Sequence, residues 1–373
     1  MTDRDTLLQI IKDDAIVRGE VTLSSGAKAD VYVDLRRVTL SGAAAPLVGR
    51  VMRELTADLE YDAVGGLTMG ADPVATAMLH AAAADGQALD AFVDLSHRDV
   101  VRIEGPDRLT WLHSLTTQHL EQLPPKQATA ALLLSPQGHV EHAFVGYDDG
   151  EAFWAHTEPG AGAALAEWLD RMRFMLRVEV SDVTADWAVT WRPREADQID
   201  DIGAALAAYE LIPRAKLTEY AAAAGQPAGI WAFEALRIAR GEPRFGVDTD
   251  HRTIPNEVGW IPSAVHLDKG CYRGQETVAR VHTLGRPPRR LTLLHLDGSE
   301  NRLPAPGSPV TAGEREVGFL GRAPPPPELR PRRLALLKRN VPTDETLTVD
   351  GMPAAQQVVV DPEVGLHVRP KLR

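Results

Sequence analysis

Hydrophobic positions recur with a helical period in some stretches of the chain and with a strand period in others. The spacing over Leu7–Lys12, with charged residues on the opposite face, predicts a helix. A turn and a strand are expected over Leu23–Asp34, and a buried strand with a glycine turn over 62–72. Pro73 suits the first turn of a helix, which the pattern continues to about Ala84. The pattern over the first ninety residues therefore predicts an α/β segment.

The middle of the chain mixes helices with strands. Ser135–Gly138 has the composition of a turn, and apolar runs on both sides of it predict a hairpin. Helical spacing begins at Pro106 and again at Ala161. The expected elements are a strand over Val100–Ile103, a helix from Pro106, strands over Ala130–Leu134 and Val140–Val145, and a helix over Ala161–Met172.

From Arg289 onward the pattern changes to short strands separated by turn residues, which is typical of a small β-barrel. The expected strands are Leu291–Leu296, Gly307–Thr311, Arg315–Leu320, Arg333–Leu337 and Thr346–Val349. The predicted fold class is therefore α+β, with an α/β segment over 1–93, a second domain over 94–288 and the barrel over 289–373.

Composition narrows the class of protein. The chain is 44% hydrophobic and 25% charged, as expected of a folded soluble protein. No apolar run approaches the roughly 20 residues that span a bilayer, and no secretory signal opens the chain, so we expect a cytoplasmic protein without a membrane partner. A net charge of −12 argues against direct binding of nucleic acid.

The chain contains one cysteine, Cys271, in the sequence Lys-Gly-Cys-Tyr-Arg-Gly-Gln-Glu at 269–276. Flanking glycines allow a sharp turn and close approach to a ligand, and Lys269 and Arg273 favour the reactive thiolate. We predict that Cys271 and Lys269 act chemically. The motif residues that support them are Gly270, Tyr272, Gly274, Gln275 and Glu276. The alternatives are a cysteine packed as a small hydrophobe, or a cysteine hydrolase that uses His266 or His282.

This motif resembles the signature of the YgfZ proteins, folate-binding relatives of the glycine-cleavage T-protein. The segments Phe233–Asp248, Thr253–Glu257, Asp94–Arg98 and Gly105–Thr116 continue the resemblance. It implies binding of tetrahydrofolate, and partners among iron–sulfur proteins or cluster-assembly factors. The implied role is assembly or repair of iron–sulfur clusters, and through it support of tRNA modification.

The resemblance also implies where the folate binds. Phe233, or Trp231 as second choice, would stack on its rings, and Arg237 would pair with its glutamate tail. In the T-protein, a strand of the hairpin carries a catalytic aspartate, whereas this chain has Glu141 and His142 there. That difference argues against aminomethyl transfer, although Glu141 and His142 remain candidate folate contacts and His142 could still bond a pterin. The alternative interpretation is that Phe233, Trp231 and His142 are structural.

Residues 5–92 resemble the N-terminal part of orotate phosphoribosyltransferases, with Ser25, Gly26 and Lys28 at positions that approach orotate and the diphosphate substrate. The strand with paired acids and the Thr-Thr-Gly turn that would bind the diphosphate and magnesium occur nowhere in the chain. We therefore predict an inactive fragment fused at about Val93, with an open apolar sheet edge.

Three candidate functions remain, which we give in decreasing order of preference. The first is a folate-binding accessory protein for iron–sulfur clusters that uses Cys271. The second is a folate-dependent aminomethyl or one-carbon transferase, and the third is an orotate phosphoribosyltransferase. No metal site is predicted, because a single cysteine cannot supply the thiolates of a cluster.

Overall fold

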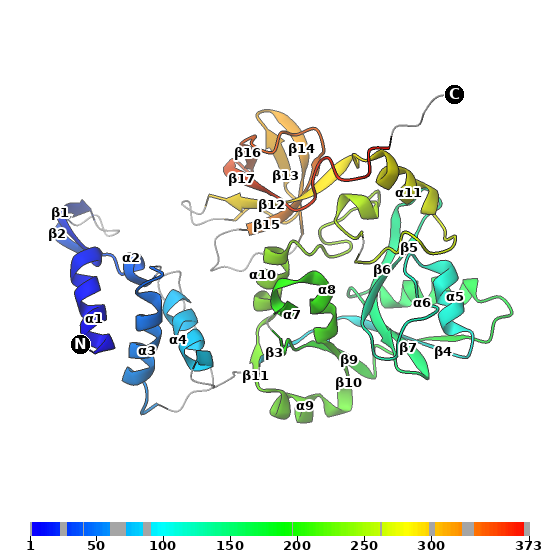
Figure 1. Cartoon of the computed structure of the whole chain (residues 1–373), viewed down its shortest axis with the longest axis horizontal. Coiled ribbons are helices and arrows are strands. Elements are labelled where there is room, and N and C mark those ends of the chain that lie inside the picture. Colours follow the sequence, from blue (N-terminus) through cyan, green and yellow to red (C-terminus); the bar gives the residue numbers. More distant parts are fainter. Residues whose placement is uncertain are drawn as a thin grey trace. The chain divides into compact units, whose positions relative to one another are not determined.

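The computed structural model describes residues 2–22, 28–39, 41–59, 72–84, 91–195, 197–261, 263–297, 303–322 and 332–368. The chain divides into two compact units, with the division between Asp90 and Ala91. Each unit is described separately below (Figure 1).

The N-terminal unit is mainly helical in its described part. Its elements are α1 (Asp3–Ile10), η1 (Ile11–Ala15), β1 (Ile16–Thr22), β2 (Lys28–Val33), α2 (Arg36–Thr39), α3 (Ala45–Leu55) and α4 (Asp72–Ala84). A capping box between Thr2 and Asp5 begins α1. The strand predicted within 62–72 falls largely outside the described residues, so the structure does not report on it.

The core of this unit forms where α1, α3 and α4 meet. Val48 and Val51 of α3 pack with Leu7 and Ala77. A Cβ on Gly49 would lie 2.0 Å from the Ala77 carbonyl oxygen, so only glycine permits this close contact between α3 and α4. By contrast, β1 and β2 form a two-stranded sheet that pairs with no other strand in the described part of the chain. Val31 and Val33 on β2 are each 48% exposed, so one face of this strand presents apolar side chains. The open apolar edge expected of the fragment stays a prediction.

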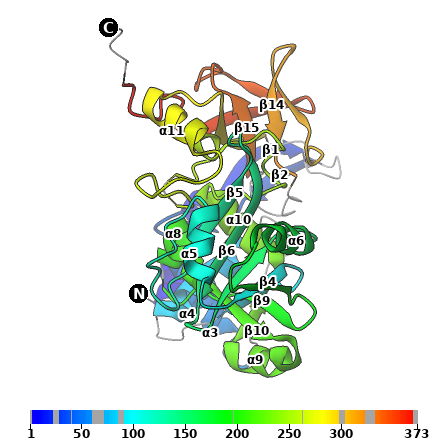
Figure 2. The same cartoon turned by 90° about the vertical axis from the view of Figure 1, so that its right-hand side faces the viewer.

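The second unit is built first on an antiparallel sheet with strand order β5-β6-β7-β4-β8. These strands are β4 (Asp99–Glu104), β5 (Thr129–Leu134), β6 (Val140–Asp148), β7 (Ala152–Thr157) and β8 (Glu179–Asp182). Helices α5 (Arg108–Leu115) and α6 (Gly162–Met172) pack on one face through Leu112, Leu165 and Leu169 (Figure 2). The opposite face of this sheet packs against other segments of the second unit.

A smaller sheet with strand order β10-β9-β3-β11 packs in the same unit. Its strands are β3 (Ala91–Asp94), β9 (Trp187–Trp191), β10 (Tyr209–Pro213) and β11 (Gln226–Ala228). β3 lies inside this sheet, between β9 and β11. The predicted join at Val93 therefore falls within a strand that belongs to the second unit.

Short helices connect these sheets to the barrel. They are α7 (Asp197–Asp200), α8 (Ile202–Ala205), η2 (Leu206–Ala208), η3 (Arg214–Lys216), α9 (Leu217–Ala224), α10 (Ile230–Arg240), η4 (Pro255–Glu257) and α11 (Gln275–Leu284). α10 ends at Gly241, whose φ of 74° places it in the left-handed region that favours glycine.

The C-terminal strands close into a barrel with strand order β12-β15-β14-β13-β16-β17. They are β12 (Arg289–Leu296), β13 (Pro309–Ala312), β14 (Arg315–Leu320), β15 (Arg332–Lys338), β16 (Leu347–Val349) and β17 (Met352–Val358). The predicted barrel and the mixed fold class are confirmed. The sequence pattern missed β17, because Pro353 and the alanines and glutamines after it have low strand propensity.

Candidate functional site

A pocket lies in the second unit, beside the sheet face that α5 and α6 leave uncovered. Its walls come from β5, β6, the end of β7, the α8–β10 segment, the loop at 242–245, and residues 260, 263 and 264. The apolar lining residues are Ala130, Leu132, Ala143, Phe144, Val145, Ile202, Leu206, Pro243, Phe245, Trp260 and Ala264. The polar lining residues are Arg98, His156, Thr157, Glu158, Tyr209, Glu242, Arg244 and Ser263.

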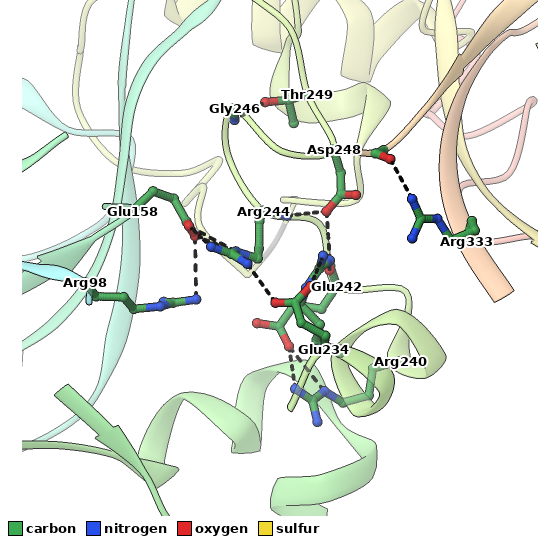
Figure 3. Close-up of polar contacts among 12 residues, drawn as sticks. Arg98, Glu158, Glu234, Arg240, Glu242, Arg244, Gly246, Asp248, Thr249 and Arg333 are labelled. Atoms are coloured by element: carbon green, nitrogen blue, oxygen red, sulfur yellow. Dashed lines mark hydrogen bonds and ion pairs between the residues drawn. The ribbon is translucent and has the colours of Figure 1, made fainter. Parts of the chain in front are cut away.

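The polar lining is organised around Glu158, which follows β7. Arg98 Nη2 lies 3.5 Å from Glu158 Oε1, and Arg244 Nε donates to Glu158 Oε2 at 2.9 Å (Figure 3). Burial works to raise the pKa of Glu158, but Arg98 and Arg244 outweigh it and hold the pKa below its usual value. Glu158 is therefore ionised, and it fixes two cations at the edge of the pocket.

The ion network continues away from the pocket through Arg244. Its Nη1 donates to Glu234 at 2.7 Å, and Glu234 in turn accepts from Arg237 at 2.6 Å. Arg237 also donates to Asp248 at 2.7 Å and to the Glu242 carbonyl at 2.9 Å. This chain of alternating charges holds the 242–248 loop against α10, and so positions the pocket wall (Figure 3).

Aromatic rings support the cationic side of the pocket. The Arg98 guanidinium carbon lies 5.4 Å from the centroid of the Tyr209 ring and 5.5 Å from that of Phe233. The Tyr209 ring also contacts the His156 ring, with centroids 4.5 Å apart. Burial, with Arg98 as a second cause, holds the pKa of His156 well below its usual range. The imidazole is therefore neutral.

The predicted cysteine motif lies behind one wall of this pocket. Tyr272 is buried against Leu132, Leu134 and Ala264, and Leu132 and Ala264 also line the pocket. Cys271 itself is exposed and is not among the lining residues. Because the thiol is exposed, packing as a small hydrophobe does not explain it.

Lys269 stabilises the local structure by hydrogen bonding to the end of a helix. Its ammonium donates to the carbonyls of His113 and Thr116, the second of these at 2.5 Å, at the C-terminal end of α5. It also lies over the Tyr272 ring, 5.1 Å from the centroid. Burial lowers the pKa of Lys269 to about 8. The cation that was predicted to favour the thiolate is thus held by backbone carbonyls.

The remaining motif residues begin α11. Gly274 is the N-cap of the helix, with a φ of 81°, and a Cβ there would lie 2.5 Å from the Ser135 carbonyl oxygen. Gln275 and Glu276 form the first turn, and Glu276 pairs with Arg280 on the surface. Gly270 has open space around its Cβ position. The motif thus needs glycine at 274 and not at 270.

The aromatic and basic residues predicted to contact a folate lie outside the pocket lining. Phe233 is 1% exposed and packs under Arg98, and Trp231 is 44% exposed at the start of α10. Arg237 is fully buried and its guanidinium is bonded to Glu234, Asp248 and Glu242, so it does not reach a ligand tail in this structure.

The hairpin residues predicted to contact a folate point elsewhere too. His142 faces the side covered by α6, where its ring contacts Trp168. Glu141 pairs with Arg273 at 2.9 Å. The residues of β6 that line the pocket are Ala143, Phe144 and Val145, none of which is acidic.

The transferase-like remnant is only partly described. Ser25 and Gly26 lie outside the described residues. Lys28 begins β2 and is exposed.

The sequence analysis did not select most of the residues that line the pocket, although two of the segments it singled out contain lining residues. Arg98 ends the Asp94–Arg98 segment, and Glu242, Arg244 and Phe245 lie within Phe233–Asp248. No residue of the first segment was chosen as a folate contact, and in the second segment Phe233 and Arg237 were chosen in place of the residues that line the pocket. His156, Glu158 and Tyr209 carried no pattern that distinguishes them from ordinary strand residues.

Comparison with known proteins separates the two parts of the chain. Residues 80–190 match the family described as GCVT N-terminal domain. The structure resembles the glycine cleavage system aminomethyltransferase T from Bartonella henselae, with a TM-score of 0.58 and 16% identity, over 84% of this chain and 97% of that one. At this identity the likeness concerns the fold.

The other similarity is to orotate phosphoribosyltransferases. The Streptomyces coelicolor enzyme is 67% identical over 112 residues, which are 29% of this chain and 62% of that protein. The Mycobacterium bovis enzyme is 58% identical over 91 residues, which are 24% of this chain and 49% of that protein. The chain thus spans less than two thirds of the length of these curated relatives.

No helix in the described part of the chain is both long and apolar enough to cross a membrane. Taken together, the comparisons show an N-terminal segment similar to orotate phosphoribosyltransferases, joined to a part that contains a GCVT-like domain and has the fold of the aminomethyltransferase T-protein.

Proposed function

We propose that residues 91–373 bind tetrahydrofolate in the pocket beside Glu158 and act as an accessory protein in the assembly or repair of iron–sulfur clusters. Such a protein supports tRNA-modifying enzymes that carry these clusters, and Cys271 is its reactive thiol. The supporting observation is the pocket itself, which combines flat apolar walls, including Trp260 and Phe245, with a charged rim in a T-protein fold.

The composition of the pocket favours binding over aminomethyl transfer. In the T-protein, a strand of the hairpin carries the catalytic aspartate. The pocket-lining stretch of β6 here offers Ala143, Phe144 and Val145, while the lining carboxylates Glu158 and Glu242 are paired with arginines. Aminomethyl transfer remains the second candidate, because the GCVT-like domain and the T-protein fold are shared with that enzyme.

The position of the motif supports a link between folate and thiol. Leu132 and Ala264 contact Tyr272 on one side and line the pocket on the other. A ligand that displaces either side chain will therefore move the segment next to Cys271, which is exposed and accessible to a protein partner.

Titration of the full chain with tetrahydrofolate tests the binding step. Because Trp260 lines the pocket, binding should quench tryptophan fluorescence and saturate. Ser263→Phe places a ring in the pocket and should weaken binding about tenfold or more. Leu267→Phe, at an exposed position four residues away, is the matched control and should bind as the wild type. Absence of saturable binding, or equal binding by S263F, would contradict the proposal.

The thiol is tested separately with Cys271→Ser. This variant should bind tetrahydrofolate within about twofold of the wild type, since the sulfur is outside the pocket lining. It should fail to restore an iron–sulfur tRNA-modifying enzyme in cells that lack their own folate-binding accessory protein. Full restoration by C271S would remove Cys271 from the mechanism, and glycine-dependent turnover of tetrahydrofolate would favour the transferase.

A further inference from the structure

The turn between α6 and β8 carries three consecutive apolar side chains that are exposed to solvent, and we call them the apolar tip. Phe174 is 80% exposed, Met175 98% and Leu176 44%. Phe174 and Met175 are more exposed than any other large hydrophobic side chain in the described part of the chain. Single exposed hydrophobic residues are ordinary, whereas a run of them at one place marks a surface that binds something.

The chain on both sides of the tip is held in place. Before it, the Met172 carbonyl accepts from Trp111 Nε1 at 3.2 Å. After it, Arg177 donates to the Asp107 carboxylate from its backbone N–H at 2.9 Å and from Nη2 at 2.6 Å. Phe174 has a φ of 49°, a left-handed value that side chains other than glycine seldom adopt. The fold therefore presents these side chains ready for contact, so little ordering is needed when a partner binds.

Each of the three arginines beside the tip has a carboxylate of its own. The pairs are Arg171 with Glu167 at 3.6 Å, Arg173 with Asp170 at 3.3 Å, and Arg177 with Asp107 at 2.6 Å. Attraction to an anionic membrane needs unpaired cations, and the net charge of −12 on the chain opposes it further. Aromatic and methionine side chains within a rim of both charge signs are instead typical of a contact between proteins.

Two helices connect the apolar tip to the cysteine motif. The first is α5, since Asp107 at its start binds Arg177, and carbonyls at its C-terminal end accept from Lys269. The second is α6, which ends at the tip. Its Trp168 ring has the guanidinium carbon of Arg273 6.0 Å from its centroid. The tip and the motif are therefore neighbours on the side of the sheet that α5 and α6 cover.

These connections limit the distance between the tip and the thiol. A helix of eight residues, such as α5, is about 12 Å long. Cys271 follows Lys269 by two residues, so its thiol lies on the order of 20 Å from Phe174. A standard protein interface of about 800 Å² on each partner is about 30 Å across. One partner can therefore cover both places, and both are exposed.

We propose that Phe174, Met175 and Leu176 anchor the protein on which Cys271 acts, by inserting into an apolar pocket of that partner. This inference rests on the proposed function, because the partner is the iron–sulfur protein that the accessory role requires. Side chains that enter a partner's pocket at a preorganised place carry most of the binding free energy of an interface. The rim of the partner's pocket should carry charges of both signs, to match the paired arginines around the tip.

The test replaces the tip in the full chain by Phe174→Ser together with Met175→Ser. In cells that lack their own folate-binding accessory protein, F174S/M175S should restore the iron–sulfur tRNA-modifying enzyme at least about tenfold less than the wild type at equal protein level. It should keep the wild-type circular dichroism and bind tetrahydrofolate within about twofold, because the tip is outside the pocket lining. Val31→Ser with Val33→Ser removes two exposed apolar side chains from the N-terminal unit, and this matched control should restore the enzyme as the wild type does.

Oxidation of the isolated full chain by hydrogen peroxide, followed by mass spectrometry, tests whether the protein itself covers the tip. Met175 should react as fast as free methionine at every protein concentration, and much faster than the buried Met352. Protection of Met175 at every concentration would mean that the N-terminal unit covers it. Protection that increases with concentration would mean that a second copy does. Either result would overturn the inference.

The remaining outcomes separate this inference from the proposed function. If F174S/M175S restores the enzyme as well as the wild type while Cys271→Ser does not, the inference is wrong and the proposed function stands. If the wild type sediments with phosphatidylglycerol vesicles and F174S/M175S does not, the tip binds lipid and the inference is wrong. Loss of tetrahydrofolate binding by F174S/M175S would also overturn it, because the change would then act on the pocket. If the wild type restores no enzyme, both the inference and the proposed function fall.

Discussion

The two parts of this chain differ in their identity to known proteins and in how much of those proteins they cover. The N-terminal unit has close relatives among orotate phosphoribosyltransferases but spans only part of their length. The fold of the T-protein is matched at low identity, yet over almost all of that chain. High identity thus accompanies partial coverage, and low identity accompanies a nearly complete fold. Percentage identity alone therefore does not show how much of a relative's structure this chain contains.

The units also differ in how they treat strand edges. In the second unit the barrel closes on itself, so its strands have no open edge. In the N-terminal unit the described strands β1 and β2 form a sheet of two, so each has an edge that no other described strand covers. We infer that the second unit carries most of the stability of the chain, and that the two units unfold in separate transitions, the N-terminal unit first.

The largest expected effect concerns phosphoribosyl transfer. The full chain with orotate and phosphoribosyl diphosphate should form nucleotide at least about 10⁴-fold more slowly than an intact transferase, because the groups that stabilise the leaving diphosphate are missing from the sequence. Absorbance of orotate measures this directly, and the Streptomyces coelicolor enzyme serves as positive control. Turnover that Lys28→Ala abolishes would show that the fragment is active.

Breaking the buried ion network should produce the largest change in stability. Arg237→Met leaves Glu234 and Asp248 buried without their shared cation, which costs about 3–5 kcal/mol. Urea unfolding followed by circular dichroism, which reports on the helices of both units, should show the shift in the later transition alone. Arg171→Met, which removes an exposed pair with Glu167, is the control and should change stability by less than about 0.5 kcal/mol. A shift of the earlier transition by R237M would contradict the separation of the units.

The two glycines of the cysteine motif offer a finer comparison. Gly274→Ala places a methyl group 2.5 Å from the Ser135 carbonyl oxygen at a left-handed φ, and should destabilise the second unit by about 2–3 kcal/mol. Gly270→Ala meets open space and should change its stability by less than about 0.5 kcal/mol. Thermal unfolding of both variants measures the difference. Equal losses of stability in the two variants would mean that the close contact and the left-handed φ at Gly274 do not determine the cost of replacing it.

The regular elements were predictable because periodicity is a local property. The leucine-rich β15 and the hairpin around Ser135–Gly138 were predicted from short windows, and both were found within a few residues of their expected positions. β17 was missed because its burial alternates without strand-forming residues, and it is held by pairing with β12 and β16.

The site was less predictable, because its charges are placed by partners far apart in sequence. Arg244 bonds to Glu158, 86 positions away, and Arg98 stacks on Tyr209 from a different element. Arg237 was chosen as a ligand contact because arginines pair with carboxylates. The structure shows that pairing, with carboxylates of the protein itself. The residue type was informative, but which carboxylate it meets depends on the fold.

The smallest expected effect is a pH dependence that belongs to the second unit. The pKa of His156 is held well below 6.5 by burial and by Arg98, so below pH 6.5 the unfolded chain takes up a proton that the folded chain does not. Stability contributed by this residue is complete above pH 6.5, and falls by about 1.4 kcal/mol per pH unit as the pH decreases. Between pH 6.5 and pH 5 the wild type should therefore lose more stability than H156F in the later urea transition. Trp187→Phe alters an aromatic ring without removing a titratable group, and should keep the wild-type slope. The same slope in H156F and the wild type would mean that the folded imidazole takes up its proton as readily as the unfolded one, and would contradict its burial in the neutral form.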